Sequence, residues 1–326
     1  MITAHVVGAS GYAAAELIRL IDRHPSVALG VLESRSQPGT RVADVFPWLP
    51  HVHVALEESG TALARVREDD VVFLAGGHDL AREQAPAFLA QGARVIDLSD
   101  AFRLHANAGE AVYGFPELHR EKIKTARLVA NPGCYVTAAL LALVPLQPLV
   151  DRIANVVIDA KSGITGAGRT PAVSSMFAEL DGDVRAYGLG GHRHGAEIVQ
   201  EARDAGIAAP IIFSPHVVPL RRGILADVYL IPRGTISRDE VLAHFERFYA
   251  ANPFVTVFRD LRAPHLPALE GTNDAHLAVA ERDGVVQILS AIDNLGKGAA
   301  GQAIQNMNLV LGLPEEDGLN ARTTVG

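Results

Sequence analysis

The chain has 326 residues, of which 48% are hydrophobic and 20% charged, so it is long enough for two domains and can bury a sizeable core. This composition excludes an intrinsically disordered chain, and a net charge of -8 without a basic run argues against a nucleic-acid partner. The single cysteine, Cys134, excludes an intramolecular disulfide and suits a reducing compartment.

The first 33 residues have the pattern of a strand, a glycine turn, a helix and a second strand. Residues 2–7 are apolar, residues 13–21 favour a helix that stops before Pro25, and residues 27–32 are apolar again. Because apolar strands that alternate with helices indicate parallel pairing, we expect the opening βαβ unit of a doubly wound sheet. The alternation predicts further strands at 71–75, 94–98 and 128–130, and helices at 79–91 and 135–143.

After about residue 150 the pattern becomes that of a mixed α+β domain. Asp283–Gly284 lies between strands expected at 276–281 and 285–292 and predicts an antiparallel hairpin. Ser237 and Glu240 have capping-box spacing and open a helix expected to reach about residue 251. Other strands are expected at 153–160, 210–213, 226–231 and 255–258, and a last helix, able to pack on either domain, at 298–311.

The longest apolar run, residues 136–149, contains two prolines and is short for a bilayer. We therefore expect no membrane span. The N-terminus also lacks the charged and apolar regions of a secretory signal, so we expect a cytoplasmic protein.

The loop Gly8-x-x-Gly11-x-x-Ala14 lies where the first strand meets the first helix. Glycine there lets the backbone approach a pyrophosphate beside a helix N-terminus, although a tight turn without a ligand has the same pattern. After the second strand, Glu33 would favour NAD by binding the ribose 2′-hydroxyl, whereas Ser34 and Arg35 would bind the 2′-phosphate of NADP. Serine with arginine makes a good phosphate clamp, so we favour NADP.

Cys134 follows Pro132–Gly133 at the expected start of a helix, where amide groups and the helix dipole stabilise a thiolate. The alternative is a cysteine buried as a small apolar residue. A nucleophile needs an acid/base partner, and His192 and His194 are candidates. Glu197 lies one helical turn after His194 and would orient its ring, so we favour His194.

Two other interpretations of the histidine pair stay open. A zinc site would need a further ligand at suitable spacing, which the sequence lacks, so we expect no metal. The pair could also lie on the surface without a role.

Two further segments are candidates for binding anions. Residues 159–169 are rich in glycine, hydroxyl groups and cations, as in a phosphate or oxyanion loop, or are simply a flexible connection. Arg221 and Arg222 end a loop that either binds the substrate or is solvated. Together with Arg103, they are candidates for holding the carboxylate and phosphate of a substrate, because a guanidinium binds both groups bidentately.

Separated motifs together resemble the N-acetyl-γ-glutamyl-phosphate reductases of arginine biosynthesis. They include Gly-Ala-Ser-Gly-Tyr at 8–12, Asn-Pro-Gly-Cys-Tyr at 131–135 and His-Arg-His at 192–194. The others lie at 97–103, 113–117, 159–169, 215–224, 271–273 and 293–302, so the resemblance covers residues 8–308 in the order of the family.

The resemblance implies an α/β fold shared with aspartate-semialdehyde dehydrogenases. It implies a Rossmann-type NADP-binding domain of residues 1–133 with 298–326, to which the C-terminal helix returns, and a catalytic and oligomerisation domain of residues 134–297. It also implies a homodimer or homotetramer. Implied cofactor ligands are Gly8, Ser10, Gly11, Tyr12, Ser34, Arg35, Ser162, Gly163, Asn294 and Lys297, and Asn131 joins the three arginines as an implied substrate ligand.

The implied reaction is the NADPH-dependent reduction of N-acetylglutamyl 5-phosphate to the semialdehyde through a thioester on Cys134. Small departures from the family's usual pattern occur at Ala14, Glu33, Val136 and Ala196. Ala196 keeps open a substrate that is an aminoadipyl or glutamyl phosphate linked to a carrier protein. Aspartyl phosphate is another possible substrate, and a non-catalytic nucleotide-binding sensor is an alternative of a different class.

Overall fold

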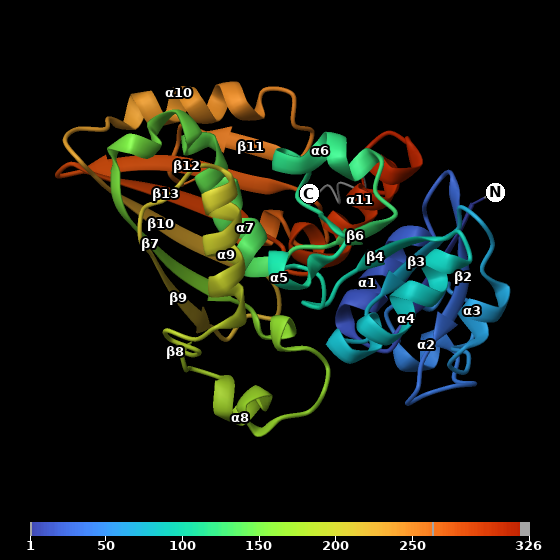
Figure 1. The fold of residues 1–326 in the computed structure, drawn as a ribbon. Coiled ribbons are helices and arrows are strands. Elements are labelled where there is room, and N and C mark those ends of the chain that lie inside the picture. The colour runs from blue at the N-terminus through green and yellow to red at the C-terminus, as the bar shows by residue number, and fades with distance from the viewer. Residues whose placement is uncertain (1, 263, 320–326) are drawn as a thin grey trace. The chain divides into compact units, whose positions relative to one another are not determined.

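The computed structural model describes residues 2–262 and 264–319 (Figure 1). The chain divides into two compact units. Among the described residues, the first contains 2–132 and 299–319, and the second contains 133–262 and 264–298. Each unit is described separately.

The first unit is built on a six-stranded parallel sheet in the order β2-β1-β3-β4-β6-β5 (Figure 1). Its central strands are almost completely buried, which explains why they are recognisable as apolar runs. The two-residue strand β5 was not predicted, because so short a segment carries no periodic pattern. The strands are β1 (Ile2–Val7), β2 (Val27–Glu33), β3 (Val71–Leu74), β4 (Arg94–Asp97), β5 (Val112–Tyr113) and β6 (Leu128–Ala130).

Helices connect these strands, and the order of the strands reverses between β1 and β3. The chain passes from β1 to β2 on one side and then crosses to β3 on the other, which makes a topological switch point at the carboxyl ends of β1 and β3. The last helix, α11 (Gly301–Leu311), belongs to this unit and packs on α1 and α6. The other helices are α1 (Tyr12–Ile21), α2 (Val42–Val45), α3 (Thr61–Arg65), α4 (His78–Ala90), α5 (His105–Ala108) and α6 (Pro116–Lys124).

The second unit contains a seven-stranded mixed sheet in the order β11-β12-β13-β10-β7-β9-β8. The predicted hairpin is confirmed: β12 and β13 pair antiparallel, and Asp283 and Gly284 have φ values of 53° and 80°. Both values suit a two-residue turn whose twist matches the strands. The strands are β7 (Ile153–Ser162), β8 (Arg185–Ala186), β9 (Ile211–Val217), β10 (Ile224–Pro232), β11 (Val255–Phe258), β12 (Ala275–Arg282) and β13 (Val285–Ile292).

The main helices of the second unit are α7 (Cys134–Leu143), α9 (Arg193–Asp204) and α10 (Arg238–Tyr249). Ser237 caps α10 by accepting a hydrogen bond from the Glu240 N–H at 3.2 Å. The Glu240 carboxylate does not complete the capping box but pairs with Arg152 at 2.6 Å. Shorter segments are η1 (Val144–Arg152), η2 (Ile164–Ala167), η3 (Val173–Ser175), α8 (Phe177–Leu180), η4 (Leu266–Ala268) and η5 (Gly296–Ala300).

The apolar run at 136–149 was predicted to be too short to cross a bilayer, but the helix that contains it is longer than the run itself. Helix α7 continues into η1, because 3-10 turns accommodate Pro145 and Pro148, and the combined helix of 19 residues is long and apolar enough to cross a membrane. However, 72% of its apolar window is buried inside the fold, where α7 packs on α9 and β10. Core packing therefore accounts for its composition.

Candidate functional site

Cys134 is the first residue of α7, as the sequence predicts. Gly133 is the N-cap and, as a glycine, has no side chain with which to cap the helix. The thiol is half-buried. This position gives a thiolate the stabilising field of the helix N-terminus.

A pocket of about 580 Å³ within the second unit contains several of the predicted site residues. Cys134 lies on its wall together with both histidines of the 192–194 motif. The glycine-rich loop after β7 contributes Ser162 and Gly163. The structure thus places the candidate nucleophile, the candidate acid/base and a candidate anion loop on one cavity.

The imidazole of His194 packs directly against the residue before the nucleophile. His194 is only 6% exposed, and a β-carbon added at Gly133 would lie 2.4 Å from His194 Nε2. Only glycine lets the ring come so close. His194 therefore lies beside the backbone that presents Cys134.

Glu197 also contacts this backbone. Its Oε1 accepts a hydrogen bond from the N–H of Gly133 at 3.0 Å, and the residue is buried. Glu197 and His194 both lie on the buried face of α9, as their spacing predicts. The sequence did not predict the contact with Gly133, because it joins residues far apart in the chain.

His192 has a structural task at the start of α9. Its Nδ1 accepts a hydrogen bond from the backbone N–H of His194 at 3.1 Å, so His192 is the N-cap of the helix. Partial burial, with the positive charge of Arg193, lowers the pKa of His192 below its usual 6.5. With Nδ1 accepting, we assign the proton of this neutral ring to Nε2.

Two tyrosines of the pocket were missed in the sequence. The hydroxyl of Tyr187 donates to that of Tyr135 at 3.2 Å, and the Tyr135 hydroxyl donates to the carbonyl of His216 at 2.7 Å. The ring of Tyr135 packs edge-on against both His192 and His194. Burial raises the pKa of both tyrosines, so they act as neutral donors. Only the position of Tyr135 next to Cys134 could have signalled a role.

The two adjacent arginines, Arg221 and Arg222, lie in the loop between β9 and β10 and are engaged with carboxylates. Arg222 pairs with the fully buried carboxylate of Asp293 at 2.6 Å, and Arg221 pairs with Glu270. Neither arginine lines the pocket described above. Their backbone instead packs on Gly163, where a β-carbon would lie 2.8 Å from the Arg222 nitrogen. This geometry favours structural ion pairs over the predicted substrate contacts.

Asn294 and Lys297 both lie inside the second unit. Asn294 accepts a hydrogen bond from the Gly223 N–H at 2.7 Å and donates to Thr165 Oγ1 at 2.9 Å, so it joins two loops beside the pocket. Lys297 is fully buried, with its ammonium 5.6 Å from the centre of the Phe254 ring.

The glycine loop of the first unit lies at the topological switch point. Gly8 has a φ of +88°, and a β-carbon there would lie 2.5 Å from the Cα of Gly76, which follows β3. A β-carbon at Gly11, the N-cap of α1 between Ser10 and Tyr12, would meet no atom within 4 Å. Open space therefore lies beside the start of α1, where a pyrophosphate fits. Gly76 was missed, although it directly follows a predicted strand.

The residues at the end of β2 differ sharply in exposure. Glu33 is 2% exposed, and its Oε1 accepts a hydrogen bond from the Ala62 N–H at 2.6 Å; burial raises its pKa. Ser34 is buried, and its hydroxyl accepts from the Gln37 N–H at 3.3 Å. Arg35 is exposed and, within the described residues, has no ion pair. One oxygen of the Glu33 carboxylate is thus bound by the protein, whereas the guanidinium of Arg35 is accessible.

Arg103 and Asn131 hold the carboxyl ends of strands in the first unit. Arg103 is buried and donates to the carbonyls of Leu98 and Asn131, each at 2.8 Å. The side chain of Asn131 accepts from Asn306 at 3.0 Å and donates to the Ala299 carbonyl at 3.1 Å. Both residues therefore have positioning contacts.

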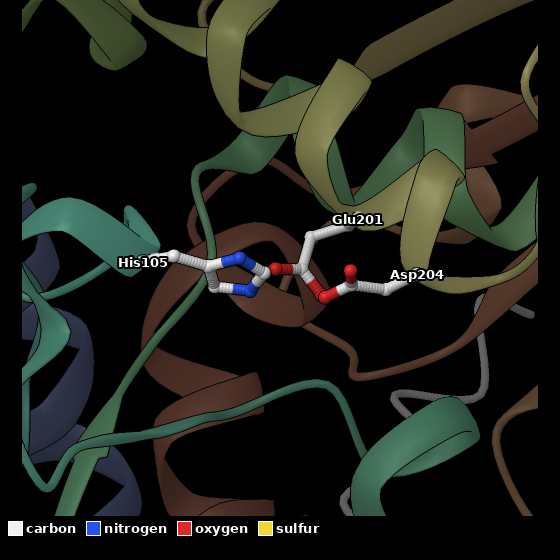
Figure 2. Close-up of side chains that lie close together, drawn as sticks. All are labelled: His105, Glu201 and Asp204. Carbon is white, nitrogen blue, oxygen red and sulfur yellow. The ribbon is translucent and has the colours of Figure 1, made fainter.

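Among the described residues, the histidine pair belongs to no cluster of three or more possible metal ligands. Further along α9, Glu201 and Asp204 lie one turn apart, with carboxylate oxygens within 4.8 Å of each other (Figure 2). Two carboxylates from one helix do not by themselves make a metal site.

Comparison with known proteins places this geometry in a class. Residues 3–126 match the family model described as the semialdehyde dehydrogenase NAD binding domain, and residues 134–294 match its dimerisation domain. A crystal structure of aspartate semialdehyde dehydrogenase II from Vibrio cholerae superposes with a TM-score of 0.76 at 19% identity, covering 95% of this chain and 98% of that one. The aspartate semialdehyde dehydrogenase with NADP from Candida albicans gives 0.74 at 15% identity, covering 96% and 99%. The fold is that of the semialdehyde dehydrogenases, and the first unit is a nicotinamide-cofactor domain.

Relatives at higher identity define the family. The chain is 43% identical to an N-acetyl-gamma-glutamyl-phosphate reductase of Dehalococcoides mccartyi (strain CBDB1), over 98% of both chains. It is also 43% identical to one of Geobacter metallireducens, again over 98% of both chains. The chain belongs to the N-acetyl-γ-glutamyl-phosphate reductase family, which confirms the resemblance found in the sequence.

Proposed function

We propose that this chain reduces N-acetyl-L-glutamyl 5-phosphate to N-acetyl-L-glutamate 5-semialdehyde and phosphate in arginine biosynthesis, with NADPH as the cofactor. The observation that carries the proposal is the pocket that gathers Cys134 with His194 beside the start of α7. Membership of a family whose relatives carry that name supports the choice of substrate.

Cys134 is the nucleophile of this proposal. Its thiolate attacks the acyl carbonyl carbon, the bond from carbon to the phosphate oxygen breaks, and inorganic phosphate leaves. The thioester that forms is easier to reduce than a carboxylate, which is why a thiol is suited to this step. Backbone N–H groups at the start of α7 are the donors that we propose for the carbonyl oxygen as negative charge develops on it.

His194 is the proposed acid/base. Reduction leaves an oxyanion on the former thioester carbon; the acid/base gives this oxygen a proton and takes the proton back as the Cys134 thiolate leaves and the aldehyde forms. His194 is supported for this role because its ring lies against Gly133. Glu197 is a positioning residue that holds Gly133 through its N–H.

When bound, the nicotinamide cofactor supplies the hydride for this reduction. Gly8, Ser10, Gly11 and Tyr12 would hold its pyrophosphate at the start of α1, where the added β-carbon at Gly11 meets open space. We propose NADP because the guanidinium of Arg35 is exposed, while Glu33 is buried and one of its carboxylate oxygens accepts a hydrogen bond from the Ala62 N–H. Ser34 would lie beside the 2′-phosphate of this cofactor at the end of β2.

Ser162 and Gly163 line the pocket and would contact the cofactor or substrate, while Asn294 and Lys297 would act by shaping the loops beside it. Arg103 and Asn131 would position the end of β6. We also propose a cytoplasmic homodimer or homotetramer, which the match to a dimerisation domain supports.

The test is an assay in the reverse direction. Purified protein with N-acetylglutamate semialdehyde, phosphate and NADP is expected to reduce the cofactor, read as absorbance at 340 nm. Aspartate semialdehyde in place of the acetylated substrate is expected to give no signal. If the protein is active only with a semialdehyde linked to a carrier protein, that compound replaces the proposed substrate. If it is active with none of the three semialdehydes, the alternative of a non-catalytic nucleotide-binding sensor is favoured.

A further inference from the structure

A segment of the second unit exposes an unusual amount of apolar surface. This segment, residues 169–191, runs from the loop after β7 to the start of α9 and is called the arm. Six of the thirteen large hydrophobic side chains exposed in the described residues belong to it. They are Val173, Met176, Phe177, Val184, Tyr187 and Leu189, and Phe177 is 79% exposed. Such a concentration on one segment marks an interaction surface.

The base of the arm, at strand β8, is anchored to the sheet, whereas its tip, formed by η3 and helix α8, does not pack on the core of the unit. The return strand β8 pairs with β9 through Arg185 and Ala186. Helix α8 packs mainly on η3 of the same arm, and Figure 1 shows α8 set apart from α7, α9 and the sheet. The exposed side chains at the tip therefore serve no visible purpose in the folding of this unit.

The kind of partner that the arm binds is inferred from the charges of the arm and from the domain in which it lies. The arm carries two arginines against three acidic residues, which disfavours an anionic membrane surface. It lies wholly within residues 134–294, which match a dimerisation domain. We propose that the arm docks its apolar side chains on a second copy of this chain; this rests on the homo-oligomer proposed above.

Docking of the arm would affect the active site, because residues at the base of the arm form part of the pocket wall. Ser174, Arg185 and Tyr187 line the pocket that holds Cys134. Tyr187 also donates to Tyr135, the residue next to Cys134. An arm held by a second copy keeps these side chains in place, so turnover per subunit falls when the oligomer dissociates.

The test compares Phe177→Asp with the wild type by sedimentation velocity over a range of concentrations. Phe177 does not line the pocket and is mostly exposed, so the variant retains its fold, as checked by circular dichroism. We expect the dissociation constant of the oligomer to rise at least about 30-fold, as for loss of an interface hot spot. Turnover per subunit is expected to fall at concentrations where the variant is monomeric. Val173→Lys is a second variant with the same expectation.

The matched control is Trp48→Asp, which changes a side chain of 56% exposure in the first unit and is expected to leave the oligomer unchanged. A wild-type protein that is monomeric at all concentrations overturns the homo-oligomer itself. A wild-type oligomer that both arm variants leave intact overturns only the docking of the arm. A monomeric Phe177→Asp with full turnover overturns the link to the active site.

Discussion

His194 and Gly133 lie so close together that no side chain fits between them. A β-carbon at position 133 would lie 2.4 Å from Nε2 of the imidazole and 2.7 Å from its Cδ2. The backbone of Gly133 has a φ of -68°, which any residue adopts, so the backbone itself does not require glycine. The histidine ring requires it. The glycine before the nucleophile thus depends on a residue that is distant in the sequence.

Gly133→Ala is therefore expected to lower kcat at least about 10-fold, because the methyl group pushes the ring of His194 or the start of α7 out of place. Steady-state kinetics with matched thermal melts measure the effect. The control is Gly195→Ala, also near the start of α9, whose β-carbon would meet its nearest neighbour, Phe213, at 3.8 Å. That variant is expected to keep kcat within about twofold, and equal losses in the two variants would contradict the argument from His194.

Cys134→Ser is expected to reduce turnover by about 1,000-fold or more, because the serine hydroxyl is not ionised near neutral pH and is a poorer nucleophile. Cofactor binding, measured by fluorescence titration, is expected to stay within about twofold of the wild type. Because Cys134 is the single cysteine, iodoacetamide is expected to inactivate the wild type with one label per chain. Substantial turnover by the serine variant would rule out the thioester.

Local sequence patterns predicted the fold better than they predicted the contacts of the site. Strands β1, β6, β11 and β13 were predicted with their bounds, because apolar and β-branched residues dominate each of them. The two-residue strands β5 and β8 are defined by their partners and were missed. Cys134 and His194 were found through short motifs. The contacts of Glu197 with Gly133 and of Arg222 with Asp293 join distant segments, and no local pattern reports them.

Arg35→Ala is expected to raise the KM for NADPH at least about 10-fold and to change the KM for NADH little, because only NADPH carries the 2′-phosphate. Kinetics with both cofactors measure the ratio. The matched variant is Glu33→Gln, which keeps an acceptor for the Ala62 N–H and is expected to leave the ratio unchanged. If Glu33→Gln changes the ratio of the KM values for NADPH and NADH while Arg35→Ala does not, Glu33 binds the ribose and the proposal of NADP is wrong.

Arg222→Ala is expected to lower the free energy of unfolding by about 3–5 kcal/mol, because it leaves the buried carboxylate of Asp293 without its cation. Chemical denaturation measures this change. The neighbouring Arg221→Ala removes an exposed pair with Glu270 and is expected to cost no more than about 1 kcal/mol. Should Arg222→Ala instead raise the KM for the substrate with no loss of stability, Arg222 is a substrate ligand as the sequence first suggested.

His194→Asn is expected to lose most of kcat and the limb of the pH–rate profile that titrates near neutral pH, because it removes the proposed acid/base. His192→Asn is expected to keep that limb. His192 already holds its Nδ1 as a hydrogen-bond acceptor, and asparagine also caps helices well. If His192→Asn loses the limb and His194→Asn keeps it, the two roles are exchanged.

Stability against pH gives an independent check on His192, because its pKa is lowered in the folded protein, chiefly by burial. Above the usual value of 6.5 the ring is neutral in both states and contributes no pH dependence. As the pH falls below that value, the unfolded chain binds a proton that the folded chain does not, so the free energy of unfolding decreases. His192→Asn removes this loss, and its melting temperature is expected to fall less than that of the wild type between pH 7 and 5.5. An identical fall in both proteins would mean that His192 is protonated in the folded state, and the assignment of a neutral cap would be wrong.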